Sequence, residues 1–252
     1  KAAAVAAGRG HNVTLYEKTA QLGGQTLLAQ LLPTRAEFGG IVTNLEQEMT
    51  IAGVTVKKNC PVDMDMISNE NPDAVILATG AEPRWPEFEG RESAHVVDAW
   101  QVLRNEANVG GSVVVADWRA DWIGIGIAEK LAEEGCRVRL AINGYMPGQT
   151  IQMYVRDTGV GRLHKLGVEM IPYARLFGAD EDTVYLQHTM SGEPIICEET
   201  DTLVLCQGHT PVNTMEDQLR ESGFEVHLVG DCLAPRTAEE AVLEGFRAGI
   251  TV

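Results

Sequence analysis

The sequence predicts an α/β protein built from two three-layer units, with the second unit inserted into the first. Short apolar segments of strand type alternate with helical segments along most of the 252 residues. The segment at residues 13–17 ends in the carboxylate of Glu17 and is followed closely by a Gly-Gly pair. A second strand–helix–strand series begins at residue 112, and a strand that can rejoin the first unit follows near residue 226.

Glu17 predicts that the first unit is a Rossmann-like, dinucleotide-binding domain. In such a βαβ unit, an acid at the end of the second strand binds the ribose hydroxyls, about 20 residues after the glycine turn that holds the pyrophosphate. Counting back about 20 residues from Glu17 passes Lys1. We therefore expect the first strand and the phosphate turn to be missing from this chain and to lie ahead of Lys1. An empty place between the strands at residues 13–17 and 226–229 would leave two rows of backbone groups unpaired.

The first domain is assigned to residues 1–88 and 209–252. Gly8 and Gly10 end its first helix with C-cap chemistry, and Pro33 stops its second helix. The expected elements are a helix at 2–8, a strand at 13–17, helices at 26–32 and 35–51, strands at 53–57, 73–79 and 226–231, and a last helix at 237–249. The inner face of the last helix is expected to carry Ala238, Ala241, Val242, Gly245 and Phe246.

The second domain is assigned to residues 89–208, after a linker that contains Pro83 and Pro86. The Ser191-Gly192 pair predicts the turn of a hairpin. The expected elements are a strand at 112–116, a helix at about 124–134, a strand at 137–142, a helix near 155–166, a β-like stretch from 168, the hairpin at 186–196 and a strand at 201–206.

Composition and charge exclude several classes of partner. The formal net charge is −16, which argues against nucleic acid and against an anionic membrane, because both need a basic surface. No apolar run approaches the roughly 20 residues of a membrane span, and the first residues lack the features of a signal peptide. The five cysteines are widely spaced and include no C-x-x-C pair, so neither a dithiol redox motif nor a local metal site is expected. Reduced thiols and a cytoplasmic location are expected.

The two domains carry an internal repeat. When the second is laid over the first, five positions are identical: Ala3 and Ala128, Ala7 and Ala132, Gly10 and Gly135, Val13 and Val138, and Leu15 and Leu140. These are core or cap positions, which indicates two related nucleotide-binding units, although any two α/β units can share such a pattern by chance.

The repeat also indicates that the second domain has lost its nucleotide chemistry. The position of Glu17 is taken by Ile142, which cannot accept a hydrogen bond from a sugar. Where a G-x-G-x-x-G turn would stand, the chain reads Arg119-Ala-Asp-Trp-Ile-Gly124, so only the last glycine remains. Asp117 and Asp121 bring negative charge towards the place of the pyrophosphate. Trp118 and Trp122 flank the turn and either block a nucleotide or pack an interface.

Five motifs in this order resemble the flavoproteins with two dinucleotide-binding domains. They are Val13-Thr-Leu-Tyr-Glu-Lys18, Leu22-Gly-Gly-Gln25, Ala78-Thr-Gly80, Gly208-His-Thr-Pro-Val-Asn213 and Val229-Gly-Asp-Cys-Leu-Ala-Pro-Arg236. The chain is most similar to the C-terminal half of the 2,4-dienoyl-CoA reductase and trimethylamine dehydrogenase family. The resemblance implies an upstream FMN-bearing barrel with a 4Fe-4S cluster, and a homo-oligomeric full-length protein. The barrel performs the substrate chemistry, so no catalytic or metal-binding residue is assigned here.

The resemblance implies a cofactor role for ten residues. Glu17 should bind the adenosine ribose, the Gly23-Gly24 backbone should lie beside the cofactor, and Val62 should offer main-chain groups to adenine. The full set is Glu17, Lys18, Gly23, Gly24, Gln25, Val62, Thr79, Gly80, Gly230 and Asp231, of which the last two should close on the pyrophosphate or on the ribityl chain of FAD.

Structural roles without a cofactor remain open for several of these residues. Glu17 can be a solvated acid at a strand end, Gly23-Gly24 a plain loop, and Asp231 a cap for the last helix. Cys232 lacks a partner cysteine, which favours a buried structural thiol over a redox role. His188, His209 and His227 show no metal-binding spacing.

Three functions compete. The one we favour is the C-terminal nucleotide-binding portion of a flavin-dependent oxidoreductase of the amine dehydrogenase or N-demethylase type, holding FAD or, in the same site, ADP. The alternative is an NAD(P)H-dependent flavin reductase of the dienoyl-CoA reductase or NADH oxidase type, which would need an intact second glycine turn. The third is a module in which a bound nucleotide is only a structural element.

Overall fold

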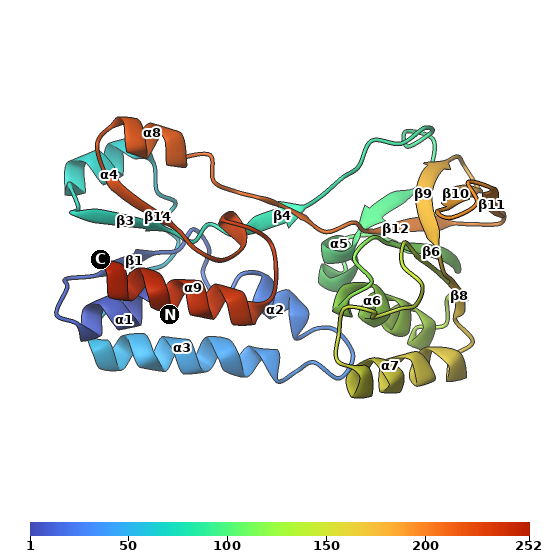
Figure 1. Cartoon of the computed structure of the whole chain (residues 1–252), viewed down its shortest axis with the longest axis horizontal. Coiled ribbons are helices and arrows are strands. Elements are labelled where there is room, and N and C mark those ends of the chain that lie inside the picture. Colours follow the sequence, from blue (N-terminus) through green and yellow to red (C-terminus); the bar gives the residue numbers. More distant parts are fainter. The chain divides into compact units, whose positions relative to one another are not determined.

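The computed structural model describes all residues, Lys1–Val252. The chain forms two compact units. Unit 1 comprises Lys1–Gln30, Ala36–Glu82 and His209–Val252, and unit 2 comprises Leu31–Arg35 and Pro83–Gly208. Parallel strands and covering helices occur in both units, which confirms the predicted α/β class (Figure 1).

Unit 1 contains two separate pairs of parallel strands. β1 (Thr14–Tyr16) pairs only with β2 (Thr55–Lys57), and β14 (Glu225–Leu228) pairs only with β3 (Ala74–Leu77). β1 and β14 do not pair with each other, so each has one edge without a strand partner. A further short pair, β4 (Ala81–Pro83) with β13 (His209–Pro211), lies where the chain leaves and re-enters the unit.

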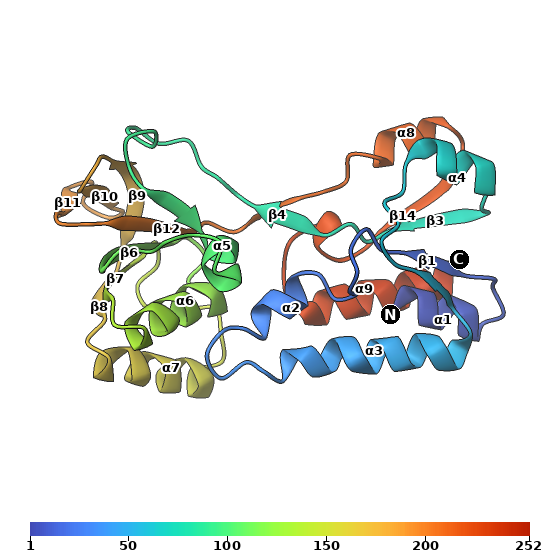
Figure 2. The same cartoon turned by 180° about the vertical axis from the view of Figure 1, so that it is seen from behind.

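Helices cover the strands of unit 1 on two sides (Figures 1 and 2). On one side, α4 (Met64–Glu70) and α8 (Glu216–Glu221) close a small apolar core over β3 and β14. On the other side, α1 (Ala2–Gly8) packs between α3 (Phe38–Ala52) and α9 (Ala238–Thr251). The members of the small core are Ile67, Leu77, Leu219, Val226 and Cys232.

Glycines allow α9 to approach α1 closely. A Cβ atom built at Gly249 would lie 2.6 Å from the carbonyl oxygen of Ala2, a separation that real Cβ atoms do not show. The buried residues of α9 are Gly245, Ala248 and Gly249. The predicted inner face of this helix is therefore wrong at Phe246, whose ring is exposed, because the helix is rotated to bring its glycines onto α1.

Other elements of unit 1 differ from the prediction in extent. The helix expected at 26–32 is α2 (Gln25–Ala29), and the helix expected at 35–51 starts only at Phe38. Both are shorter because Leu31–Arg35 leaves unit 1 and packs in unit 2. α4 was not predicted, although Asp63 marks its start by accepting a 2.9 Å hydrogen bond from the amide of Met66.

Unit 2 is built on a five-stranded parallel sheet. Its strand order is β5-β12-β6-β7-β8, formed by Val96–Asp98, Thr202–Cys206, Ser112–Asp117, Arg137–Ile142 and Glu169–Ile171. All residues of β6 and β12 are buried, as expected of central strands that are covered on both faces.

Two different layers cover this sheet (Figure 1). Helices α5 (Ala99–Arg104), α6 (Trp122–Glu133) and α7 (Met153–Lys165) lie on one face. A three-stranded antiparallel sheet of β9 (Ala174–Ala179), β10 (Val184–His188) and β11 (Pro194–Cys197) packs on the other face. β10 and β11 form the predicted hairpin.

The segment Leu31–Arg35 packs against α6. Leu32 is buried and fills the space beside Gly126, where a Cβ atom would lie 2.7 Å from a methyl carbon of Leu32. The guanidinium of Arg35 stacks 3.7 Å from the ring centroid of Trp122, a cation–π contact. The segment Leu31–Arg35, which lies in sequence between α2 and α3, therefore covers part of α6.

No helix in either unit combines the length and apolar character needed to span a lipid bilayer.

Candidate nucleotide-binding site

Glu17 follows β1 directly, at the carboxyl end of the strand. Its backbone is bonded into the sheet edge, because its amide donates to Lys57 O at 2.9 Å and its carbonyl accepts from the amide of Cys60 at 2.9 Å. One carboxylate oxygen, Oε1, accepts from both the amide and the hydroxyl of Thr19, each at 2.8 Å. This arrangement fixes the carboxylate through Oε1 and leaves Oε2 without a protein donor.

The two glycines of the Gly23-Gly24 pair have different roles. Gly23 has φ +116°, and a Cβ atom there would lie 2.6 Å from a methyl carbon of Val42, so the residue is required for packing against α3. Gly24 has φ +49°, immediately precedes α2, and has no atom within 4 Å of the Cβ position. The open space at Gly24 gives a ligand direct access to the backbone.

Gln25, Gly80 and Asp231 come together from three distant parts of unit 1. The side-chain amide of Gln25 donates to Asp231 Oδ2 at 2.9 Å, and it lies 3.9 Å from the Cβ position of Gly80. Gly80 has φ +75°, and its carbonyl accepts from the amide of Val212 at 2.9 Å. The Thr79 hydroxyl donates to the carbonyl of the same Val212. The ends of β3 and β14 are thereby tied to the start of α2, the point at which parallel α/β sheets bind ligands.

Gly230 and Asp231 are already engaged within the protein. The amide of Gly230 donates to Glu244 Oε2 at 2.8 Å, and Asp231 Oδ1 accepts from the amide of Arg236 at 3.2 Å. Glu244 also forms an ion pair with Arg236. The alternative that Asp231 caps the last helix is wrong, because Thr237 caps α9 in a capping box with Glu240.

Lys18 and Val62 are the remaining predicted site residues. Lys18 is exposed beside Glu17. Val62 packs its side chain against the small core of unit 1, two residues after the Cys60 amide that bonds Glu17. Cys232 is fully buried and lies 3.0 Å from the carbonyl oxygen of Leu77, which agrees with a structural thiol. Sequence reasoning missed Thr19, Val212 and Glu244, which hold the predicted residues in place.

The equivalent turn of unit 2 is filled by its own carboxyl groups. Asp117 ends β6, is 2% exposed, and accepts a 2.9 Å hydrogen bond from the amide of Ala120 through Oδ1. Its Oδ2 is buried without a partner and occupies the space where a Cβ at Gly124 would stand. Asp121 caps α6 by accepting from the amide of Ile123 at 3.0 Å. Backbone amides that would bind a phosphate are therefore used internally.

The charges around this turn differ from the prediction. Burial, together with the nearby charge of Asp121, raises the pKa of the Asp117 carboxyl to about 8. Asp117 is therefore mostly uncharged at neutral pH, and the predicted repulsion of phosphate by two aspartates is wrong for this residue. Arg119 does not offer a free guanidinium, because its Nε lies 2.8 Å from Asp121 Oδ2. Ile142, at the former ribose position, is 0% exposed.

The chain resembles known oxidoreductases over nearly its whole length. A family model described as pyridine nucleotide-disulphide oxidoreductase matches residues 1–245. Bilirubin reductase of Mediterraneibacter gnavus (strain CC55_001C) is 33% identical over 98% of this chain, which covers 38% of that protein. A probable N-methylproline demethylase of Rhizobium meliloti (strain 1021) is 35% identical over 98% of this chain, which covers 41% of that protein.

A solved structure of 2-naphthoyl-CoA reductase with 2-naphthoyl-CoA matches the whole fold. The TM-score is 0.88 with 25% sequence identity, and the match covers 100% of this chain and 38% of that one. The chain thus spans about two fifths of the length of the relatives that it matches. The five cysteines are all free thiols. The chain belongs to the pyridine nucleotide-disulphide oxidoreductase family.

Proposed function

We propose that unit 1 binds the adenosine diphosphate part of FAD, or ADP itself, with the ribose on Glu17. The observation that carries this proposal is the carboxylate of Glu17, which Thr19 holds through one oxygen while the other faces no protein donor. Gly24 provides open backbone at the start of α2, and Gln25 and Asp231 are bonded to each other at the ends of β3 and β14. FAD, when bound, supplies two-electron redox chemistry, whereas ADP supplies none.

We further propose that this chain is the C-terminal nucleotide-binding portion of a flavoprotein of the amine dehydrogenase or N-demethylase type. The filled turn of unit 2 supports this branch, since it argues against a nicotinamide nucleotide as the source of electrons. The similarity to a probable N-methylproline demethylase points the same way. In this proposal the FMN-bearing barrel and the 4Fe-4S cluster belong to an upstream part of the same protein, which assembles as a homo-oligomer.

An NAD(P)H-dependent flavin reductase is the second candidate. The similarity to bilirubin reductase favours it, because a reductase needs an electron donor. The two candidates make opposite predictions for nicotinamide nucleotide binding by unit 2.

Replacing Glu17 tests the proposed ribose contact. The substitution Glu17→Ala should weaken ADP binding by about 1–3 kcal/mol, because hydrogen bonds to a charged group are lost. Calorimetric titration of the chain with ADP measures this change. Glu221→Ala, which removes an exposed acid from the end of α8, is the matched control and should leave the affinity unchanged. Equal affinities of the wild type and Glu17→Ala would place the ribose elsewhere.

We also propose that a further strand lies between β1 and β14. Val13 accepts from the amide of Thr55 and Glu17 donates to the carbonyl of Lys57, so the residues on either side of β1 face β2. Thr14 and Tyr16 therefore direct their backbone groups to the open edge. With this strand in place, the amides of Thr14 and Tyr16 should exchange with solvent as slowly as that of Leu15. Hydrogen exchange measured by NMR or mass spectrometry provides the test, and fast exchange at Thr14 and Tyr16 alone would argue for an open edge.

A further inference from the structure

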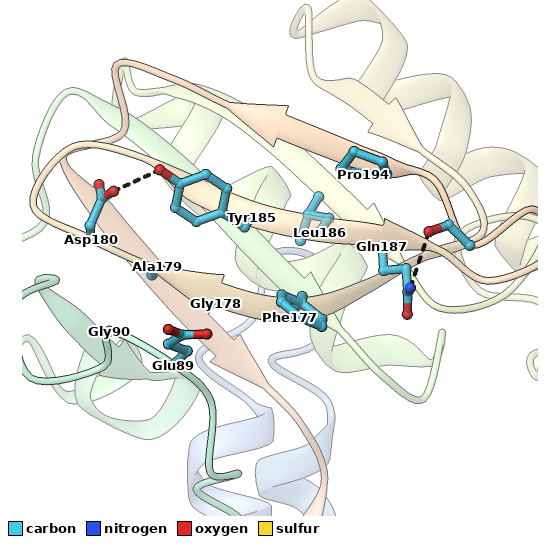
Figure 3. Close-up of a pocket in the computed structure, with 11 residues that line it drawn as sticks. Glu89, Gly90, Phe177, Gly178, Ala179, Asp180, Tyr185, Leu186, Gln187 and Pro194 are labelled. Carbon is cyan, nitrogen blue, oxygen red and sulfur yellow. Dashed lines mark hydrogen bonds between the residues drawn. The ribbon is translucent and has the colours of Figure 1, made fainter.

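Unit 2 has a cavity of about 490 Å³ beside its antiparallel sheet (Figure 3). A cavity of this volume is in the range that holds small organic ligands. Its walls include two aromatic rings, two carboxylates, one amide and one proline: Phe177, Tyr185, Glu89, Asp180, Gln187 and Pro194.

Two glycines bring Glu89 against the edge of β9. Glu89 forms a parallel bridge with Gly178, and its carbonyl accepts from the amide of Ala179 at 2.9 Å. Gly90 has φ +79°, and a Cβ there would overlap the carbonyl oxygen of Ala179. A Cβ at Gly178 would lie 3.0 Å from the carbonyl oxygen of Glu89. The backbone carrying this carboxylate is therefore fixed at the wall of the cavity.

A β-bulge exposes the ring of Phe177. The pairing of β9 with β10 shifts between Tyr185, which faces Gly178, and Leu186, which faces Leu176. Phe177 is the extra residue, and 57% of it is exposed while Leu176 packs into the core. Bulges redirect side chains in this way and are frequent beside functional sites.

Asp180 supplies the second carboxylate in a fixed position. Its Oδ2 accepts a 2.7 Å hydrogen bond from the hydroxyl of Tyr185, and its Oδ1 accepts from the amide of Thr183 at 3.0 Å. The Tyr185 bond, followed by backbone amides, lowers the pKa of Asp180, so the group is an anion at neutral pH. Neither Asp180 nor Glu89 forms an ion pair with a cationic side chain. Figure 3 shows both carboxylates and both rings around the same cavity.

We propose that this cavity binds a small organic cation, a substituted ammonium group with an apolar or aromatic part. The rings of Phe177 and Tyr185 line the cavity and can contact the cation, and Glu89 and Asp180 supply the opposite charge. A phosphate or carboxylate ligand is disfavoured here because the ionisable groups of the wall, Glu89, Asp180 and Tyr185, are all acids. The cavity and the Glu17 site share no residue, so this inference does not depend on the function proposed for unit 1.

Titration with benzyltrimethylammonium tests the proposal. Calorimetry or ligand-observed NMR on the whole chain should show saturable binding, and benzyl alcohol, the uncharged comparison, should bind at least about fivefold more weakly. The variants Glu89→Gln and Phe177→Ser should each weaken binding about three- to thirtyfold. Both side chains are exposed, so the variants should keep the fold, which circular dichroism checks.

The control variant is Glu87→Gln. It removes the same charge two positions earlier, from a side chain that is 95% exposed and outside the cavity, and it should leave affinity within about twofold. An equal loss in Glu87→Gln would mean general attraction to an acidic protein and would overturn the site. The proposal also fails if the probe does not bind, or if only an arginine-containing peptide binds, since that would make the surface a protein-docking site.

Discussion

Unit 2 is expected to lose stability as the pH rises from about 4 to about 8, through the titration of Asp117. The folded-state pKa of this carboxyl is about 8, raised from 3.8 by burial and by the charge of Asp121. A raised pKa means that the folded unit binds the proton more tightly than the unfolded chain. The stabilisation is therefore fully present below pH 3.8 and is lost as the pH rises through the folded value of about 8. The loss should amount to several kcal/mol, on the order of 5.

Tryptophan fluorescence during denaturant unfolding measures this effect selectively, since all four tryptophans lie in unit 2. Asp117→Asn is the control, because the amide has the same shape as the protonated acid and does not ionise. The wild type should become less stable than Asp117→Asn as the pH increases. Parallel stability curves for the two proteins across this range would show that Asp117 ionises normally in the folded state.

NADH is expected to bind unit 2 no more tightly than a millimolar dissociation constant, a binding free energy weaker than about −4 kcal/mol. Asp117 and Asp121 use the amides of Ala120 and Ile123, and Ile142 offers no acceptor to a ribose. A nucleotide would have to displace these carboxyl groups, and its sugar hydroxyls would lose water without gaining a partner.

The titration must be made both with and without Glu17→Ala, because NADH also carries an adenosine diphosphate part that the proposed site of unit 1 would accept. Nicotinamide fluorescence follows binding in the presence and absence of this substitution. Micromolar binding that survives Glu17→Ala and disappears when residues 117–124 are changed would favour the NAD(P)H-dependent reductase. Binding that disappears with Glu17→Ala alone would support the assignment to unit 1.

Much of the fold could be predicted from the sequence because strands and turns are marked by residues that are close together in the chain. Strand β7 was predicted with its observed bounds, and the hairpin around Ser191-Gly192 follows from turn chemistry. α4, α5 and α8 were missed because each is only one or two turns long, so apolar periodicity gives little signal. Phe246 was wrongly predicted to lie on the inner face of α9. The rotation of this helix depends on the contact of Gly249 with Ala2, which joins the two ends of the chain.

The candidate site could likewise be predicted only in part from the sequence. Glu17 and Gly24 carry recognisable sequence patterns, whereas the bond between Gln25 and Asp231 joins residues 206 positions apart. The charge state of Asp117 also required the structure, since it depends on burial and not on residue type. Sequence patterns predict which residues can bind a ligand, whereas burial and long-range hydrogen bonds decide their charge and position.

The packing of Leu31–Arg35 on α6 constrains how this protein can change by recombination. A genetic exchange that replaced only the contiguous stretch of unit 2, residues 83–208, would bring in a new α6 while retaining the old Leu32 and Arg35. To keep its contacts with Leu32 and Arg35, the new α6 would need a glycine at the position of Gly126 and an aromatic ring at the position of Trp122. Inheritance of the two coding segments is therefore coupled, and substitutions at residues 32 and 126 should be found together across lineages.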